Sequence, residues 1–103
     1  MLETAKSPTG VEIRLTGERW AHITEEHSEL AGRRYEVLET IANPLEIYLA
    51  DSGESYAIRE VDTGKFLVVV HREVGADGFV ITAFFTRRLK TIQKRKLIWS
   101  SPK

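Results

Sequence analysis

Apolar and polar residues alternate over residues 11–15, which predicts a half-buried strand. Thr16 follows this strand and has a side chain suited to capping a helix N-terminus. Leu15 and Trp20 stand at the two positions whose side chains pack together across such a helix start. We therefore expect a first helix over residues 17–26.

A second helix is predicted over residues 32–42. Residues 28–31 break the first periodic pattern, and apolar residues then recur at helical spacing over residues 35–42. Asn43 and Pro44 end the pattern, because proline cannot continue a helix.

The remaining chain is typical of strands separated by turns. The turn-forming residues Gly, Asp, Ser and Asn bound four β-rich segments, which are residues 45–50, 55–61, 66–71 and 79–85. The last two segments are almost continuously apolar, so we expect them at the centre of the sheet. We expect the residues before the first strand to form a short flexible N-terminus.

The tail after Arg88 fits two kinds of element. Leu89, Ile92 and Leu97 would line one side of a short helix, whereas residues 97–99 would suit an edge strand. A turn followed by a short strand or arm is the favoured interpretation. The whole pattern predicts an α+β fold with two N-terminal helices packed on one face of a four- to five-stranded antiparallel β-sheet.

Length and composition narrow the class of protein. The chain has 103 residues, enough for one domain with a single core, and its apolar fraction of 42% is that of a globular protein. No apolar run approaches the roughly 20 residues that span a bilayer, and the N-terminus lacks the apolar stretch of a signal peptide. Without cysteine there is no disulfide or thiolate metal site. We therefore expect a cytoplasmic protein without membrane contact.

The zero net charge hides a strong asymmetry between the two parts of the chain. Residues 1–62 carry 13 acidic and 6 basic residues, a balance of −7, whereas residues 63–103 carry 2 acidic and 9 basic residues, a balance of +7. Either the two parts neutralise each other in the fold, or the C-terminal part forms a cationic surface that binds anions. The second interpretation is favoured because six bases cluster closely: Arg87, Arg88, Lys90, Lys94, Arg95 and Lys96.

Three histidines, His22, His27 and His71, are suited to proton transfer near pH 7. His22 and His27 lie about 140° apart around a helix, so they do not match a helical two-histidine zinc site. A metal site would need all three histidines or added carboxylates. We expect neither a metal nor another cofactor.

Cleavage of RNA without a metal needs a base for the 2′-hydroxyl, an acid for the leaving 5′-oxygen, and cations for the charged intermediate. His22 and His27 could supply the first two, and Arg87 and Arg88 the third. Each residue also has a structural interpretation: His22 as a bonded helix-face residue, His27 as a cation at a helix C-terminus, and the arginines as solvated charges. His71 closes a strand, and it is either a surface residue or part of the substrate-binding set.

Two threonines and two aromatic residues complete the candidate site. Thr82 interrupts an apolar strand, and its hydroxyl must be bonded to be buried without cost. Thr86 either binds a phosphate beside the arginines or caps the turn. Tyr48 and Trp99 are the aromatic residues most suited to stacking on a base, and Lys90 would join Arg88 in binding the phosphate backbone.

Four segments together resemble, in order and character, the phage-associated branch of the barnase–EndoU–colicin–RelE-like nuclease superfamily. They are residues 15–30 (LTGERWAHITEEHSEL), 40–50 (TIANPLEIYLA), 66–73 (FLVVVHRE) and 79–88 (FVITAFFTRR). The resemblance covers about residues 11–99 and implies a single nuclease domain over residues 1–103, with helices followed by a four-stranded antiparallel sheet.

The resemblance also implies roles for individual residues. The histidine of the W-x-H-I motif corresponds to His22, and that of the H-x-E motif to His27. The T-A-x-x-T-R motif places its threonines at Thr82 and Thr86 and its arginine at Arg87.

The activity implied by this resemblance is metal-independent endoribonuclease cleavage by acid–base transesterification, in a toxin or a phage- or conflict-associated effector. RNA is the expected partner, and an acidic antitoxin or inhibitor protein would fit the basic part of the chain. The alternative is a non-catalytic RNA- or protein-binding module on the same scaffold. Ser28 stands where the family more often has proline, which would loosen the turn that aims His27.

Overall fold

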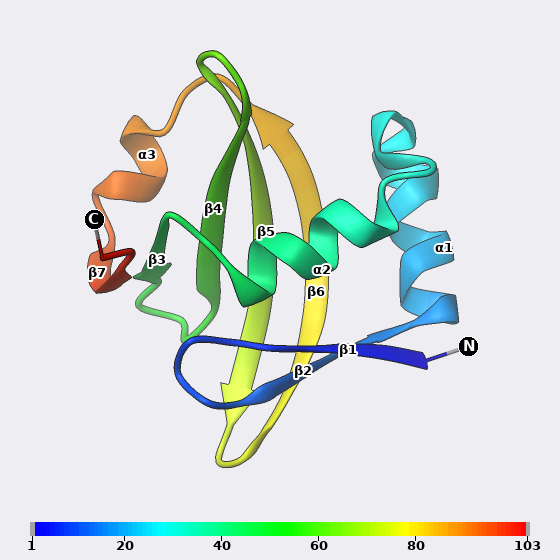
Figure 1. Cartoon of the computed structure of the whole chain (residues 1–103), viewed down its shortest axis with the longest axis horizontal. Helices are drawn as coiled ribbons and strands as arrows, with labels where there is room; N and C mark the ends of the chain where they lie inside the picture. Colours follow the sequence, from blue (N-terminus) through cyan, green and yellow to red (C-terminus); the bar gives the residue numbers. More distant parts are fainter. Residues whose placement is uncertain (1, 103) are drawn as a thin grey trace.

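A computed structural model describes residues 2–102, which form one seven-stranded sheet, three α-helices and a short 3-10 helix (Figure 1). In chain order these elements are β1 (Leu2–Lys6), β2 (Glu12–Thr16), α1 (Gly17–Glu26), η1 (Ser28–Leu30), α2 (Arg34–Ala42), β3 (Glu46–Leu49), β4 (Ser55–Asp62), β5 (Lys65–Val74), β6 (Asp77–Thr86), α3 (Lys90–Gln93) and β7 (Lys96–Ser100). Within the described range, no helix has the length and apolar character needed to cross a bilayer.

The sheet has the strand order β1-β2-β6-β5-β4-β3-β7 and is mixed. The pairing of β2 with β6 is parallel, through Glu12 with Asp77 and Arg14 with Phe79 at its two ends, and the other neighbouring strands are antiparallel. The predicted fold class is therefore wrong. The sheet has seven strands rather than four or five, it is not purely antiparallel, and a third helix, α3, follows it.

The errors have physical causes. The segment of β1, LETAK, is rich in residues that strands disfavour, and it becomes a strand because β2 offers a complete antiparallel partner. The parallel β2–β6 pair joins segments from opposite parts of the chain, which leaves no local periodic signal. The tail forms both elements that its sequence allowed, a single helical turn, α3, and the edge strand β7.

α1 begins and ends where its sequence predicts. The Thr16 hydroxyl accepts a hydrogen bond of 3.0 Å from the backbone N–H of Arg19, which caps the helix. Ile23 on α1 and Ile41 on α2 are fully buried and pack against one face of the sheet, in a core that includes Leu67 and Val69 of β5. We call this side of the sheet the helix-covered face.

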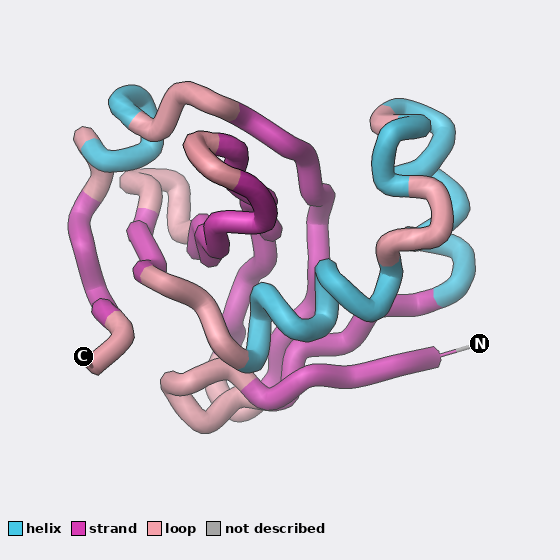
Figure 2. The backbone as a smooth tube through the Cα atoms, turned by 45° about the horizontal axis from the view of Figure 1, so that its top comes forward, coloured by secondary structure: helices cyan, strands magenta, loops and turns pink. Residues whose placement is uncertain are grey.

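The opposite face of the sheet has a different cover. Ile58, Val68 and Val70 point to this side and form a second apolar cluster with Ile92 of α3. Figures 1 and 2 show α3 and α1 on opposite sides of the central strands. We call this side the open face, because α3 is only one turn long and covers only part of it.

A bulge in β6 decides which of its side chains reach each face. Val70 pairs with Thr82 and the next residue, His71, pairs with Val80, so Ile81 is the extra residue. Before the bulge, the even-numbered Val80 joins the helix-covered core. After it, the odd-numbered Ala83 and Phe85 do so, while Phe84 turns to the open face.

Candidate active-site pocket

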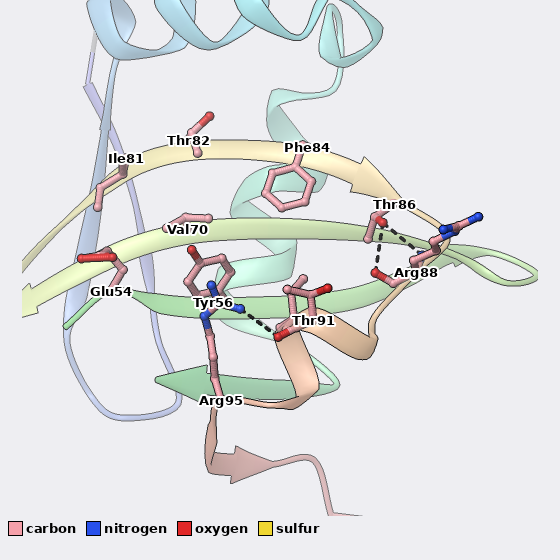
Figure 3. Close-up of a pocket in the computed structure, with 11 residues that line it drawn as sticks. Glu54, Tyr56, Val70, Ile81, Thr82, Phe84, Thr86, Arg88, Thr91 and Arg95 are labelled. Carbon is pink, nitrogen blue, oxygen red and sulfur yellow. Dashed lines mark hydrogen bonds between the residues drawn. The ribbon is translucent and has the colours of Figure 1, made fainter. Parts of the chain in front are cut away.

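A pocket of about 620 Å³ lies on the open face. It is bounded by β4, β5, β6 and the segment around α3 (Figure 3). The lining residues are Glu54, Tyr56, Val70, Ile81, Thr82, Phe84, Thr86, Arg88, Thr91, Ile92 and Arg95. Strand alternation and the β6 bulge bring these residues together, although they come from four separate parts of the sequence.

The floor of the pocket is apolar and aromatic. Tyr56 and Phe84 are half-buried and lie beside Val70. The Arg95 guanidinium carbon sits 4.5 Å from the centre of the Tyr56 ring, a cation–π contact. Arg95 Nη1 also donates a hydrogen bond of 2.9 Å to the Thr91 carbonyl, which holds the guanidinium over the ring (Figure 3).

The second cation of the pocket is Arg88, at the end of β6. The Thr86 hydroxyl accepts a hydrogen bond of 3.0 Å from the Arg88 backbone N–H, which fixes the turn that projects Arg88 (Figure 3). Thr86 thus acts as a turn cap, one of its two predicted roles. Among residues 2–102, neither Arg88 nor Arg95 forms an ion pair, so both guanidinium groups can bind an anion.

One carboxylate lines the pocket, and it already has a cationic partner. Glu54 Oε2 accepts a hydrogen bond of 2.6 Å from Arg72 Nη2, and Glu54 Oε1 accepts one of 2.6 Å from the Ser52 hydroxyl. Because Arg72 balances this carboxylate, the pocket keeps a positive character from Arg88 and Arg95.

His27 lies outside the pocket lining, at the end of α1 and close to Phe84. Its ring centre is 6.2 Å from that of Phe84, which itself lines the pocket. The histidine ends α1, its backbone N–H bonds to the Ile23 carbonyl, and its carbonyl accepts from Leu30 in η1. Its side chain is 32% exposed, and Nδ1 lies 3.8 Å from Glu29 Oε2. The backbone bonds hold the position of His27 although Ser28 replaces proline there.

His22 is not in this pocket. Its side chain is 55% exposed, and Nε2 lies 3.6 Å from Glu26 Oε1 one turn later on α1. It lines a separate shallow hollow with Thr16, Glu18 and Arg19. The two histidines of the sequence prediction therefore occupy different surroundings, and only His27 adjoins the residues at the end of β6.

Arg87 and Arg88 leave β6 in different directions. The Arg87 side chain turns away from the pocket. Its Nη1 donates a hydrogen bond of 3.3 Å to the Thr63 carbonyl in the turn between β4 and β5. Arg88, not Arg87, lines the pocket. Lys90 is exposed at the start of α3 and outside the pocket lining.

The two aromatic residues expected to stack on a base are not in the pocket. Tyr48 is only 6% exposed, and its hydroxyl donates a hydrogen bond of 2.8 Å to Glu46 Oε1, so its ring is not available to stack on a base as expected. Burial, reinforced by Glu46, raises the pKa of Tyr48. Trp99 is half-buried on β7, paired with Ile47 of β3. Tyr48 is buried because it packs in the open-face cluster with Ile58, Val70 and Ile92 of α3.

His71 is fully buried on the helix-covered side of β5, so the expectation of a surface or substrate-binding residue is wrong. Neither ring nitrogen has a hydrogen-bond partner among the described residues, and Nδ1 lies 3.8 Å from Glu73 Oε2. Burial lowers the pKa of His71 to about 4. The residue is therefore neutral at pH 7 and serves packing rather than proton transfer.

Thr82 keeps a buried hydroxyl that forms no hydrogen bond within residues 2–102. In Figure 3 its side chain lies on the opposite side of β6 from Ile81 and Phe84, toward α1. The same described range contains no cluster of three or more His, Cys, Asp or Glu residues arranged to hold a metal ion.

Tyr56, Glu54 and Arg95 carry no individual signal of a site in the sequence. Tyr56 is one of several aromatic residues in strands, and Arg95 is one of six bases in a cluster. Only the placement of α3 over β4 brings Arg95 onto Tyr56. The single local signal was the spacing of Thr91 and Arg95, which one helical turn brings within hydrogen-bond distance.

Two curated bacterial proteins are similar to the chain over a limited region. Over 80 residues, 78% of this chain, 30% are identical to a polyribonucleotide nucleotidyltransferase of Bifidobacterium adolescentis (strain ATCC 15703 / DSM 20083 / NCTC 11814 / E194a). The corresponding protein of Bifidobacterium longum subsp. infantis (strain ATCC 15697 / DSM 20088 / JCM 1222 / NCTC 11817 / S12) is 29% identical over 80 residues. The aligned parts make up 9% and 8% of these two relatives, so the chain spans less than a tenth of their length.

No solved structure matches the chain. The model of a nuclease family, described as phage-Barnase-EndoU-ColicinE5/D-RelE like nuclease2, matches residues 2–100. This match covers nearly the whole chain and confirms the resemblance in its motifs. The chain therefore belongs to this nuclease family.

Proposed function

We propose that the chain is an endoribonuclease that cleaves RNA without a metal ion, with its active site in the open-face pocket. The observation that carries the proposal is the convergence of Arg88, Arg95 and an aromatic floor on one pocket of a nuclease-family fold, with His27 next to the pocket residue Phe84. The two guanidinium groups suit a phosphodiester, and Tyr56 and Phe84 suit a base.

The chemistry follows from these groups. The 2′-oxygen of the bound ribose attacks the phosphorus, the bond to the 5′-oxygen breaks, and a 2′,3′-cyclic phosphate and a 5′-hydroxyl form. His27 accepts the 2′-hydroxyl proton, and the 5′-oxygen takes a proton from water at the pocket mouth. The hydroxide formed takes the proton that His27 holds, which restores the base. Arg88 and Arg95 stabilise the negative charge that develops on the phosphorane.

RNA is the proposed substrate for two reasons. The transesterification needs a 2′-hydroxyl, and the two arginines of the pocket suit the charged phosphorane that this reaction forms. The related Bifidobacterium proteins are named for polyribonucleotides, although the matched region is only a small part of each.

The direct test is incubation of the purified protein with a labelled single-stranded RNA in EDTA. We expect fragments ending in a 2′,3′-cyclic phosphate, no cut where the 2′-hydroxyl is replaced by hydrogen, and a large loss of cleavage in Arg88→Ala. Lys6→Ala is the matched control, because Lys6 is an exposed cation on β1. Salt-sensitive RNA binding without any product would support the non-catalytic binding module instead.

We propose a toxin-like effector role for the same activity. Induced expression should then arrest growth, and a variant that has lost RNA cleavage should relieve the arrest. Normal growth with folded, active protein would contradict the effector role and leave the nuclease assignment intact.

A further inference from the structure

A second hollow adjoins the active-site pocket on the far side of Arg95. It has a volume of about 690 Å³ and lies between the turn from β3 to β4 and the segment from α3 to β7. Thr91 and Arg95 line both the pocket and this hollow. The two cavities are therefore neighbours, with the Arg95 side chain between them.

The second hollow is strongly basic. Lys94, Arg95 and Lys96 line it, and Asp51 is the carboxylate on its opposite side. Lys94 and Lys96 are exposed and form no ion pair within residues 2–102. These cations are available for an anionic ligand.

Several arginines elsewhere on the molecule have carboxylate partners. Arg14 pairs with Asp77 at 2.9 Å, and Arg34 pairs with Glu3 at 2.9 Å. These arginines have carboxylate partners within the fold. Lys94 and Lys96 lack such partners among the described residues and, unlike the isolated Lys6, they line one hollow together with Arg95. An external anion bound in this hollow would neutralise them.

We propose that the second hollow binds the phosphate next to the scissile one, and that the substrate is therefore a single-stranded RNA longer than a dinucleotide. This inference rests on the proposed nuclease function and extends it to the neighbouring nucleotide. Arg95 lies between the two cavities and contacts the backbone where the strand passes from one to the other. Lys94 and Lys96 hold the next phosphate.

The aromatic floor explains why the strand must be single. Tyr56 and Phe84 lie below the rim formed by Arg88 and Arg95, so a base reaches them only after leaving its stack. Bases in an A-form duplex stay stacked and paired, whereas the bases of a single strand can turn into a pocket. A strand that inserts one base keeps its backbone near Arg88 and Arg95. Arg95 also lines the second hollow, so the next phosphate of the strand reaches that hollow.

The test uses a non-cleavable 2′-O-methyl hexanucleotide and measures its dissociation constant as a function of salt by fluorescence anisotropy. Each phosphate contact contributes about 0.7 to the slope of log K against log salt for single strands. The double variant Lys94→Ala/Lys96→Ala should lower the slope by about 1.4 if each lysine neutralises one phosphate. Lys6→Ala, an exposed lysine on β1, should leave the slope unchanged.

Cleavage of an unmodified dinucleotide separates this inference from the proposed function. The dinucleotide fills only the pocket, so the double variant should cleave it at the wild-type rate while cutting the unmodified hexanucleotide more slowly. An unchanged salt slope with retained cleavage would overturn the second subsite and leave the nuclease function standing. Absence of cleavage by the wild-type protein would overturn the proposed function, and the salt slope would still decide whether the hollow binds a strand.

Discussion

The two faces of the sheet use the same strands and differ in what covers them. On the helix-covered face, Leu67 and Val69 are fully buried under α1 and α2. On the open face, Tyr56 and Phe84 remain half-exposed beside a one-turn helix. The first arrangement removes apolar surface from water, whereas the second leaves an aromatic floor that a ligand can cover.

The comparison shows how a small domain separates stability from function. Alternation along each strand sends neighbouring residues to opposite faces, so one strand serves both purposes. In β6, Ala83 and Phe85 join the core, whereas Phe84 lines the pocket. Substitutions at adjacent positions should therefore affect different properties.

The largest difference in cleavage rate is expected between variants of His22, on α1, and His27, at its C-terminal end. His27→Ala should lower kcat/KM for RNA cleavage by about 10²–10⁴-fold, because His27 lies next to Phe84 of the pocket and is the proposed base. His22→Ala should leave it roughly unchanged, because His22 lies in another hollow. Initial rates on a labelled RNA, with thermal melts as a check on folding, measure the difference. Equal losses in both variants would contradict a site built on His27 alone.

Truncating a core side chain on the helix-covered face should lower the stability of the fold without a direct effect on the pocket. Leu67→Ala should lower the free energy of unfolding by about 2–5 kcal/mol, since Leu67 is fully buried and its truncation leaves a cavity. Urea denaturation monitored by tryptophan fluorescence measures this loss. In the fraction that stays folded, kcat/KM should be retained. A stable variant with lost activity would show that the two faces are not separable.

The buried His71 makes the helix-covered face sensitive to acid. Its pKa falls from 6.5 to about 4 on folding, so between these values the unfolded chain binds more protons than the folded one. Stability must then decrease as the pH falls below 6.5. From pH 7 to pH 5 we expect a loss of about 2 kcal/mol, measured by urea denaturation at each pH.

His71→Gln is the control for this dependence. Glutamine does not titrate, so the free energy of unfolding of the variant should change less over the same pH range. The variant should also be less stable at pH 7, because the substitution alters a fully buried side chain. An equally steep dependence in the variant would assign the acid sensitivity to other groups.

The smallest effects are expected for two tyrosines, Tyr56 in the pocket and Tyr48 in the interior. Tyr56→Ala should weaken binding of a non-cleavable RNA by about 1–2 kcal/mol, because its ring forms the pocket floor. Tyr48→Phe should leave RNA binding unchanged and lower stability by about 1 kcal/mol, because it removes a buried hydrogen bond to Glu46. Anisotropy and urea denaturation on both variants measure the two quantities. Weakened binding in Tyr48→Phe would contradict the assignment of Tyr48 to the interior.

Much of the local structure could be predicted from the sequence. The cap at Thr16 and the bounds of α1 are as predicted, because both depend on residues within a few positions of each other. The apolar runs at residues 66–71 and 79–85 lie within β5 and β6, at the centre of the sheet. The nuclease family was also predicted correctly, from the order of its motifs.

The composition of the candidate site could not be predicted from local sequence patterns. The sequence predicted that Arg87 and Arg88 both bind the phosphate, whereas the structure turns Arg87 to Thr63 and places only Arg88 of the two in the pocket. The unpaired Ile81 changes which side of β6 each later residue occupies, and a bulge is defined by the pairing of two strands. The sequence of β6 alone does not show it.

The sequence by itself determined the elements with local causes: the capped α1, the central hairpin of β5 and β6, and the concentration of bases after Thr86. Tertiary structure alone decided the parallel contact of β2 with β6, the burial of His71, and the stacking of Arg95 on Tyr56. The physical reason is the sequence distance over which each interaction acts. Caps and periodicity act over a few residues, whereas register and face depend on which distant segments pair.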